Sequence, residues 1–260
     1  MKAIDSYDWT KSTEENYTCS GTGSLIGAYK RLREDGIDRQ FHSVYSHERQ
    51  LFQDQIINYY IEKKSGWNRP AWKQGNTHRT LPHTNTTKKR LDNSPFALFT
   101  AGAMGAGKSH TLRWLARNTN FPLSNAVFID IDRIREHFPE MHEYRKRWAP
   151  TCGTLTHKEA GYISELIWMA ALENGQSVII DSSLRDLSWW SSVIQRIRNN
   201  NPKYSIGLLQ VVAKVETIFK RQHQRAQSTG RMVPFKTLID SIRQTPVSVV
   251  SRICCLFLLF

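Results

Sequence analysis

A glycine-rich turn followed by a lysine and a serine lies near the middle of the chain, in the stretch TAGAMGAGKSHTLRWL from Thr100 to Leu115. From Gly102 to Ser109 the spacing is G-x-x-x-x-G-K-S, which is typical of a loop that binds phosphate. The glycines let successive backbone N–H groups point at one anion, and the positive end of the following helix adds to the attraction. The sequence therefore predicts a nucleoside triphosphate site. Its binding residues are Gly102, Ala103, Met104, Gly105, Ala106, Gly107, Lys108, Ser109 and His110.

Two side chains at the end of this loop suit the rest of the nucleotide. Lys108 is placed to reach the β- and γ-phosphates, and the Ser109 hydroxyl is placed to ligate Mg²⁺. We therefore expect a nucleoside triphosphate, ATP or GTP, together with Mg²⁺. The loop is common to motor proteins, GTPases and small-molecule kinases, but no N-K-x-D motif for reading guanine follows it.

Acidic residues follow two later apolar runs. We expect Asp130 and Asp132, in AVFIDIDRIREH, at the carboxyl end of a strand with their side chains on the same side. A carboxylate beside the γ-phosphate can accept the proton of an attacking hydroxyl, whereas Asp130 is equally suited to capping the next helix. Asp181 ends the run SVIID, where it could hold Mg²⁺ through water or face the acceptor.

Strands and helices alternate around these motifs. Short apolar runs predict strands over Phe96–Gly102, Ala126–Asp132, Ser177–Asp181 and Tyr204–Ala213. Helical patterns cover 107–118, 159–175, 187–200, 215–227 and 235–244. Because each strand is almost continuously apolar, we predict an α/β fold of the P-loop NTPase type, with a mainly parallel sheet and helices on both faces.

We expect the chain to divide into an amino-terminal extension (1–94), a P-loop domain (95–250) and an apolar tail (251–260). Residues 1 to about 45 lack periodicity and predict loose structure, a helix begins near Ser46, and a connector rich in Gly, Pro, Asn and Thr follows. The tail ends in ICCLFLLF, which is shorter than the ~20 residues of a membrane-spanning helix. We interpret it as a buried terminal segment or the cut edge of a longer chain.

The formal net charge of +13 makes polyanions candidate partners. The basic residues are dispersed and no aromatic RNA-binding motif accompanies them, so the charge favours solubility and attraction of an anionic substrate over nucleic acid binding. The four cysteines lack metal-ligand spacing, and the first residues do not form a signal peptide. We therefore expect a cytoplasmic location, without a transmembrane segment; the oligomeric state is left open.

Five motifs, in the order AGAMGAGKS, IDIDRIREHFPE, HKEAGYISEL, VIIDSSLRD and RAQSTGR, resemble those of the zeta-toxin family of P-loop kinases. They extend from about Phe96 to Val247. The resemblance implies an α/β kinase that takes the γ-phosphate from ATP. Bacterial toxins of this family phosphorylate the 3′-hydroxyl of the sugar in UDP-N-acetylglucosamine.

The resemblance also implies roles for particular residues. It makes Lys108 the phosphate lysine and Asp132 the base that activates the acceptor hydroxyl. Arg225 and Arg231 match two lid arginines that clamp the triphosphate, a role that suits planar, permanently charged guanidinium groups. The positions that face the acceptor are Asp132, Glu165, Asp181, Ser183 and Arg185. The alternatives are an exposed basic helix face for Arg221 and Arg225 and a solvated helix position for Glu165.

Three functions remain open from the residues. The first is an ATP-dependent kinase that phosphorylates a hydroxyl of a small molecule, with a nucleotide sugar such as UDP-N-acetylglucosamine as the leading acceptor. The second keeps this chemistry but uses a polynucleotide end or another small molecule, supported by the net charge. The third is a nucleotide-binding interaction module with an incomplete active site.

Overall fold

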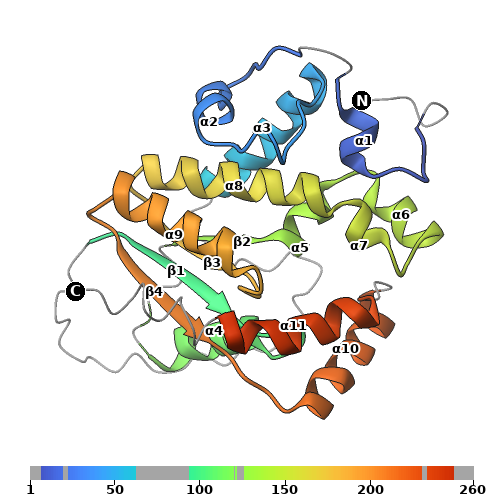
Figure 1. Ribbon diagram of the computed structural model, residues 1–260, viewed down its shortest axis with the longest axis vertical. Coiled ribbons are helices and arrows are strands. Elements are labelled where there is room, and N and C mark those ends of the chain that lie inside the picture. The colour runs from blue at the N-terminus through green and yellow to red at the C-terminus, as the bar shows by residue number, and fades with distance from the viewer. Residues whose placement is uncertain are drawn as a thin grey trace, which may run out of the picture.

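The computed structural model describes residues 7–19, 23–62, 94–119, 121, 126–229 and 233–248. Within these residues, four parallel strands form one sheet in the order β2-β3-β1-β4 (Figure 1). The strands are β1 (Phe96–Ala101), β2 (Ala126–Asp130), β3 (Ser177–Asp181) and β4 (Ser205–Gln210). This arrangement confirms the predicted parallel sheet, and each strand lies within a predicted apolar run.

The apolar runs are continuous because both faces of the sheet are covered. Successive side chains of a strand point to opposite faces. Phe99 and Ile180 lie on the face that packs against α8 (His157–Glu173) and α9 (Leu187–Asn200). Phe128 and Ile179 lie on the other face, in a cluster with Leu112 of α4 (Lys108–Asn118). The predicted fold class is therefore confirmed.

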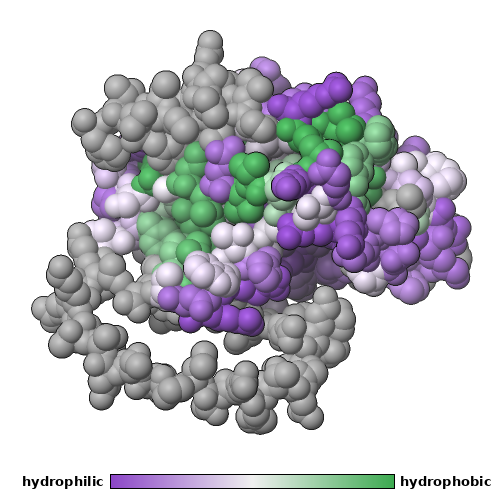
Figure 2. All heavy atoms as spheres, turned by 90° about the horizontal axis from the view of Figure 1, so that it is seen from below, coloured by the Kyte–Doolittle hydropathy of each residue, from purple (hydrophilic) through white to green (hydrophobic). Residues whose placement is uncertain are grey.

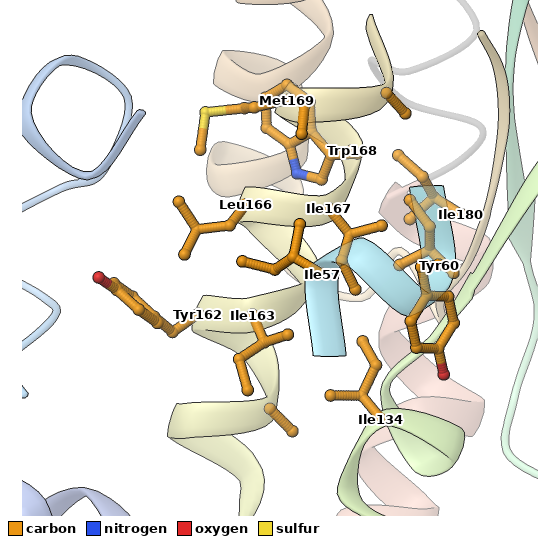
Figure 3. Close-up of a cluster of buried hydrophobic side chains, with 14 of the residues drawn as sticks. Ile57, Tyr60, Ile134, Tyr162, Ile163, Leu166, Ile167, Trp168, Met169 and Ile180 are labelled. Atoms are coloured by element: carbon orange, nitrogen blue, oxygen red, sulfur yellow. The ribbon is translucent and has the colours of Figure 1, made fainter. Parts of the chain in front are cut away.

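Helix α8 lies between the sheet and three amino-terminal helices (Figure 1). These helices are α1 (Thr13–Tyr17), α2 (Lys30–Asp35) and α3 (His47–Glu62). Figure 3 shows Ile57 of α3 beside Ile163 and Ile167 of α8, and Tyr60 of α3 next to Ile180 of β3, in one cluster of buried side chains. Because α8 is covered on both sides, its burial extends around the helix to residues such as Trp168.

The expectation of loose structure over residues 1 to about 45 is wrong for the described part of that segment. Ser12 and Glu15 form a capping box at the start of α1, in which each residue's side chain accepts the backbone N–H of the other. Thr18 pairs with Tyr45 in an antiparallel bridge, and the Tyr45 side chain is buried. Helices of five or six residues are too short to show a period in the sequence, and packing against the rest of the protein stabilises them.

Helix α3 begins near the predicted residue, since the Ser46 hydroxyl accepts the backbone N–H of Arg49. The Arg49 side chain is fully buried and bonds two carboxylates. Its Nε and Nη2 atoms donate to Glu159 of α8 at 2.7 and 2.9 Å, and Nη1 donates to Glu140 at 3.0 Å. Glu140 directly precedes α6 (Met141–Arg147). This ionic network fastens the amino-terminal region to two other parts of the fold.

The remaining helices lie between β2 and α8 and after β4. Between β2 and α8, the sequence analysis did not identify α6 or three further short helical segments. They are α5 (Ile131–Ile134), the 3₁₀ turn η4 (Arg135–His137) and α7 (Cys152–Leu155). After β4, α10 (Val215–Thr229) and α11 (Phe235–Ser248) pack through Ile218 and Leu238 against the glycine-rich loop.

The connector after α3 and the apolar tail 251–260 lie outside the described residues. The helices within the described ranges are all too short or too polar to cross a membrane.

Candidate active site

Three polar residues lie side by side at the carboxyl edge of the sheet. Thr100 of β1 and Asp130 of β2 both pair in register with Asp181 of β3, which lies between them. The Thr100 hydroxyl donates to Asp181 Oδ1 at 2.7 Å. Since parallel strands end at the same edge, two carboxylates that are 51 positions apart in the numbering become neighbours where the glycine-rich loop begins.

The loop between β1 and α4 depends on glycine at two points. A Cβ at Gly102 would lie 2.5 Å from the carbonyl oxygen of Val211, so a side chain does not fit there. Gly107, directly before α4, has φ +106°, a left-handed conformation that other residues rarely adopt. No side chain caps the start of α4. The first N–H groups of this helix can therefore bind an anion.

Lys108 and Ser109 both lie next to Asp181. Lys108 Nζ donates to the carbonyl of Gly102 at 3.1 Å and lies 3.9 Å from Asp181 Oδ1. Ser109 Oγ donates to Asp181 Oδ2 at 3.1 Å. The structure thus brings together three of the residues that the sequence analysis singled out.

Asp130 and Asp132 have different surroundings. Strand β2 ends at Asp130, so Asp132 lies in the first turn of α5, and the expected alternation of both residues on a strand is wrong. The Asp130 side chain accepts the N–H of Asp132 at 2.8 Å and caps α5, as the capping alternative predicted. Burial, together with the carboxylates of Asp132 and Asp181, raises the pKa of Asp130 to about 7.

Two guanidinium groups flank the Asp132 carboxylate. Arg135 Nη1 lies 3.1 Å from Oδ1, and Arg225 Nη2 of α10 donates to Oδ2 at 2.5 Å. Burial disfavours the charge on Arg225, but the neighbouring carboxylates, Asp132 first among them, outweigh it and raise the arginine's pKa. Arg225 therefore faces the acidic edge of the sheet and is more than part of an exposed basic helix face. Arg231 lies outside the described residues.

The loop between β3 and α9 carries Ser183 and Arg185, both partly exposed. Leu184 between them has φ +51° and is the one non-glycine residue with positive φ in the described ranges. Such a conformation is unusual for a bulky residue and needs the surrounding packing to hold it. The Leu184 side chain is fully buried. It anchors the loop, so that its two neighbours stay at the surface.

Glu165 lies in the middle of α8 and is buried, so its alternative interpretation as a solvated residue is wrong. Its Oε1 atom lies 2.9 Å from Nε2 of His42, in the segment between α2 and α3. Tyr60 of α3 lies near Asp130: burial first, and then that carboxylate, raises the tyrosine's pKa. The amino-terminal region therefore contacts Glu165, and α3 also packs against β2, which ends at the acidic edge. Whether Glu165 and the β3–α9 loop bind an acceptor stays a prediction.

Sequence reasoning missed three contacts of the site. Thr100 directly precedes the loop motif, and Arg135 stands one helical turn after Asp132, so local spacing offered a signal for both. Arg221 donates to carbonyls of the glycine-rich loop from α10. Its only signal was its place four residues before Arg225 on the same helical pattern.

A glycine-rich loop between β1 and α4, acidic residues at the neighbouring strand ends and an arginine from a later helix define an α/β protein of the P-loop kinase class. The family model described as zeta toxin matches residues 81–252, which is more than half of the chain. The chain therefore belongs to the zeta toxin family, whose members are kinases. The resemblance stated from the sequence motifs is confirmed.

Two solved structures share the fold. A chain of the PezAT chromosomal toxin–antitoxin system of Streptococcus pneumoniae matches with a TM-score of 0.52 and 19% identity over 71% of this chain. The match covers 64% of that chain, so the present chain spans less than two thirds of its length. A chain of the AvrRxo1-ORF1:-ORF2 crystal structure with ATP matches with a TM-score of 0.57 and 12% identity, covering 94% of this chain and 69% of that one. At these identities the likeness shows the fold alone. No protein of curated function matches the sequence significantly.

Proposed function

We propose that the protein is an ATP-dependent kinase that transfers the γ-phosphate to a hydroxyl of a small molecule. The observation that carries this proposal is the meeting, at one edge of the sheet, of the glycine-rich loop with the Asp132–Arg225 pair. One half of this arrangement suits a triphosphate, and the other offers a base and a cation for phosphoryl transfer.

On the nucleotide side, backbone N–H groups at the start of α4 bind phosphate oxygens. The Lys108 ammonium exchanges its contact with the Gly102 carbonyl for the β- and γ-phosphates. No step needs a large movement of Lys108, because its side chain already lies within the loop. ATP is the nucleotide that we propose, since no guanine-reading motif follows the loop.

The residues of the site fit Mg²⁺. Ser109 Oγ and Asp181 Oδ2 lie 3.1 Å apart at the end of the loop, and hydroxyl and carboxylate oxygens are ligands that Mg²⁺ prefers. The described residues contain no group of three or more His, Cys, Asp or Glu side chains suited to a metal. Mg²⁺ binds through few protein ligands, substrate phosphates and water, and here Ser109 would bind the ion directly and Asp181 would bind it through water. When bound, the ion would neutralise charge on the phosphates.

On the acceptor side, Asp132 takes the proton of the acceptor hydroxyl as its oxygen bonds to the γ-phosphorus. The bond between this phosphorus and the β,γ-bridging oxygen breaks, and ADP leaves. Arg225 turns from Asp132 to the oxygens of the transferred group, which frees the base, and Arg231 is the second lid arginine. Glu165, Asp181, Ser183 and Arg185 hold the acceptor.

We propose a nucleotide sugar such as UDP-N-acetylglucosamine as the acceptor, on the strength of the family alone. A polynucleotide end is the rival, supported by the net charge of +13. Binding of a polynucleotide needs a basic track along the surface. On the face seen in Figure 2, apolar side chains lie next to polar ones. Hydropathy does not distinguish basic side chains from other polar ones, so the choice between the two acceptors rests on the assay.

The test measures transfer of label from ATP, in the presence of Mg²⁺, to UDP-N-acetylglucosamine and to oligonucleotides in parallel reactions. We expect label on the nucleotide sugar, and we expect Asp132→Asn to slow transfer by about 10²–10⁴-fold while ATP binding persists. Asp35→Asn, at an exposed position of α2, is the matched control and should leave transfer unchanged. Full activity of Asp132→Asn would remove Asp132 as the base. Label on oligonucleotides alone would favour the rival, and ATP binding without any transfer would favour an interaction module.

A further inference from the structure

We propose that Arg221 is a positioning residue that holds the phosphate-binding loop in the orientation that a phosphate group needs. The inference deepens the proposed function and rests on it. Arg221 Nη1 donates to the carbonyl of Ala106 at 2.8 Å and to that of Gly105 at 3.3 Å. One guanidinium group of α10 therefore bonds two successive carbonyls of the loop.

These bonds fix the direction of a backbone donor. The carbonyl of Ala106 belongs to the same peptide unit as the N–H of Gly107. The described backbone contains no cis peptide bonds, and in a trans peptide the carbonyl and the N–H point in opposite directions. By holding the carbonyl from the side of α10, Arg221 turns the N–H of Gly107 away from that helix. The N–H of Ala106 donates to the carbonyl of Ala103 at 3.0 Å, so Gly107 supplies the donor that Arg221 directs.

The charge on Arg221 also acts on this peptide unit. A cation at the carbonyl end polarises the peptide and strengthens the hydrogen bond that its N–H donates. A phosphate bound at Gly107 therefore receives a stronger donor when Arg221 is in place. This effect needs a bond to the carbonyl, which Arg221 makes.

Helix α10 packs closely against the loop at this point. A Cβ at Gly107 would lie 3.1 Å from Arg221 Nη1, and one at Gly105 would lie 3.1 Å from the carbonyl of Ile218 and 3.2 Å from Nε2 of Gln222. Residues 218, 221 and 222 lie on one face of α10, as the helical repeat requires. Glycine is therefore favoured at position 107 for two reasons: its left-handed φ and the close approach of the Arg221 guanidinium group.

The same face of α10 continues to Arg225, which contacts Asp132. One helix therefore touches the phosphate-binding loop and the proposed base from positions four residues apart. Arg221 is exposed, so its removal leaves no cavity in the core, whereas Gln222 is buried. A loss of nucleotide binding in an Arg221 variant can therefore be separated from unfolding.

The first measurement compares ATP affinity and steady-state kinetics of wild type, Arg221→Ala, Arg221→Lys and Lys220→Ala. We expect Arg221→Ala to raise the KM for ATP and its Kd by about tenfold, the effect of one charge-assisted hydrogen bond, with a smaller change in kcat. Arg221→Lys should recover part of the affinity, because a lysine can bond one carbonyl but lacks the planar fork. Lys220→Ala removes the same charge from an exposed neighbouring position and should behave as wild type.

The second measurement is backbone hydrogen exchange of the loop in the full chain without nucleotide, which depends on neither ATP nor catalysis. We expect faster exchange over residues 105–110 in Arg221→Ala and not in Lys220→Ala. Unchanged exchange overturns the inference even if ATP affinity falls, because Arg221 would then be a direct phosphate ligand. If the wild type fails to bind ATP, the proposed function falls, and faster loop exchange in Arg221→Ala would still support a positioning role for Arg221.

Discussion

Replacing Arg49 with methionine tests whether the amino-terminal helices are part of the structural core of this kinase fold. The Arg49 side chain has no exposed surface, and its partners Glu140 and Glu159 are 6% and 0% exposed. Methionine keeps much of the apolar stem but leaves two buried carboxylates without a cation. Breaking a buried ion pair in this way costs about 3–5 kcal/mol of unfolding free energy. For a chain of this size each kcal/mol lowers the Tm by about 2–4 °C, so we expect a fall of about 6–20 °C.

The assay is thermal and urea unfolding followed by circular dichroism, with two comparison variants. Arg31→Met removes an exposed pair with Glu173 and should cost at most about 1 kcal/mol. The triple variant Arg49→Met/Glu140→Gln/Glu159→Gln neutralises the stranded carboxylates and should regain most of the loss, because uncharged groups are much cheaper to bury. The reasoning fails if Arg49→Met stays within about 1 kcal/mol of wild type, or if the triple variant is no more stable than the single one.

Two further predictions concern the edge of the sheet. Lys108→Ala should weaken ATP binding by about tenfold or more, measured by calorimetry, and should abolish phosphoryl transfer, measured with labelled ATP. Lys30→Ala, at an exposed position, is the control. Unchanged affinity and turnover in Lys108→Ala would refute the proposed phosphate site. Asp130→Asn keeps a side chain that can cap α5 but removes a carboxyl whose pKa is raised from 3.8 to about 7. A raised pKa means that the stability linked to the protonated carboxyl is present below pH 3.8 and is lost as the pH rises through about 7. In urea unfolding without Mg²⁺, the unfolding free energy of the variant should therefore rise relative to that of wild type as the pH increases from 3.8 to about 7. A relative fall over this range would contradict the raised pKa of Asp130.

The sequence by itself determined the features that depend on neighbouring residues. The strands, of five or six residues each, lie within the predicted apolar runs, and the glycine-rich loop follows from the glycine spacing before Lys108 and Ser109. Asp130 as a helix cap is likewise a local matter, since the residue bonds an N–H two positions away. Local chemistry therefore sufficed for the fold class, and the nucleotide half of the candidate site stays a prediction that rests on the same local spacing.

Tertiary structure alone decided which distant residues meet. Arg225 reaches Asp132 across 93 positions, and Asp181 lies between Thr100 and Asp130, because strand order and register place them there. Arginine is usually exposed, yet the Arg49 side chain is buried, because the packing of α3 on α8 places it against the carboxylates of Glu140 and Glu159. Charge in the sequence does not specify its partner, since an ionic contact depends on distance in space and not on separation along the chain. The short helices before Ser46 could not be predicted from the sequence for the same reason, because their stability comes from packing against α8.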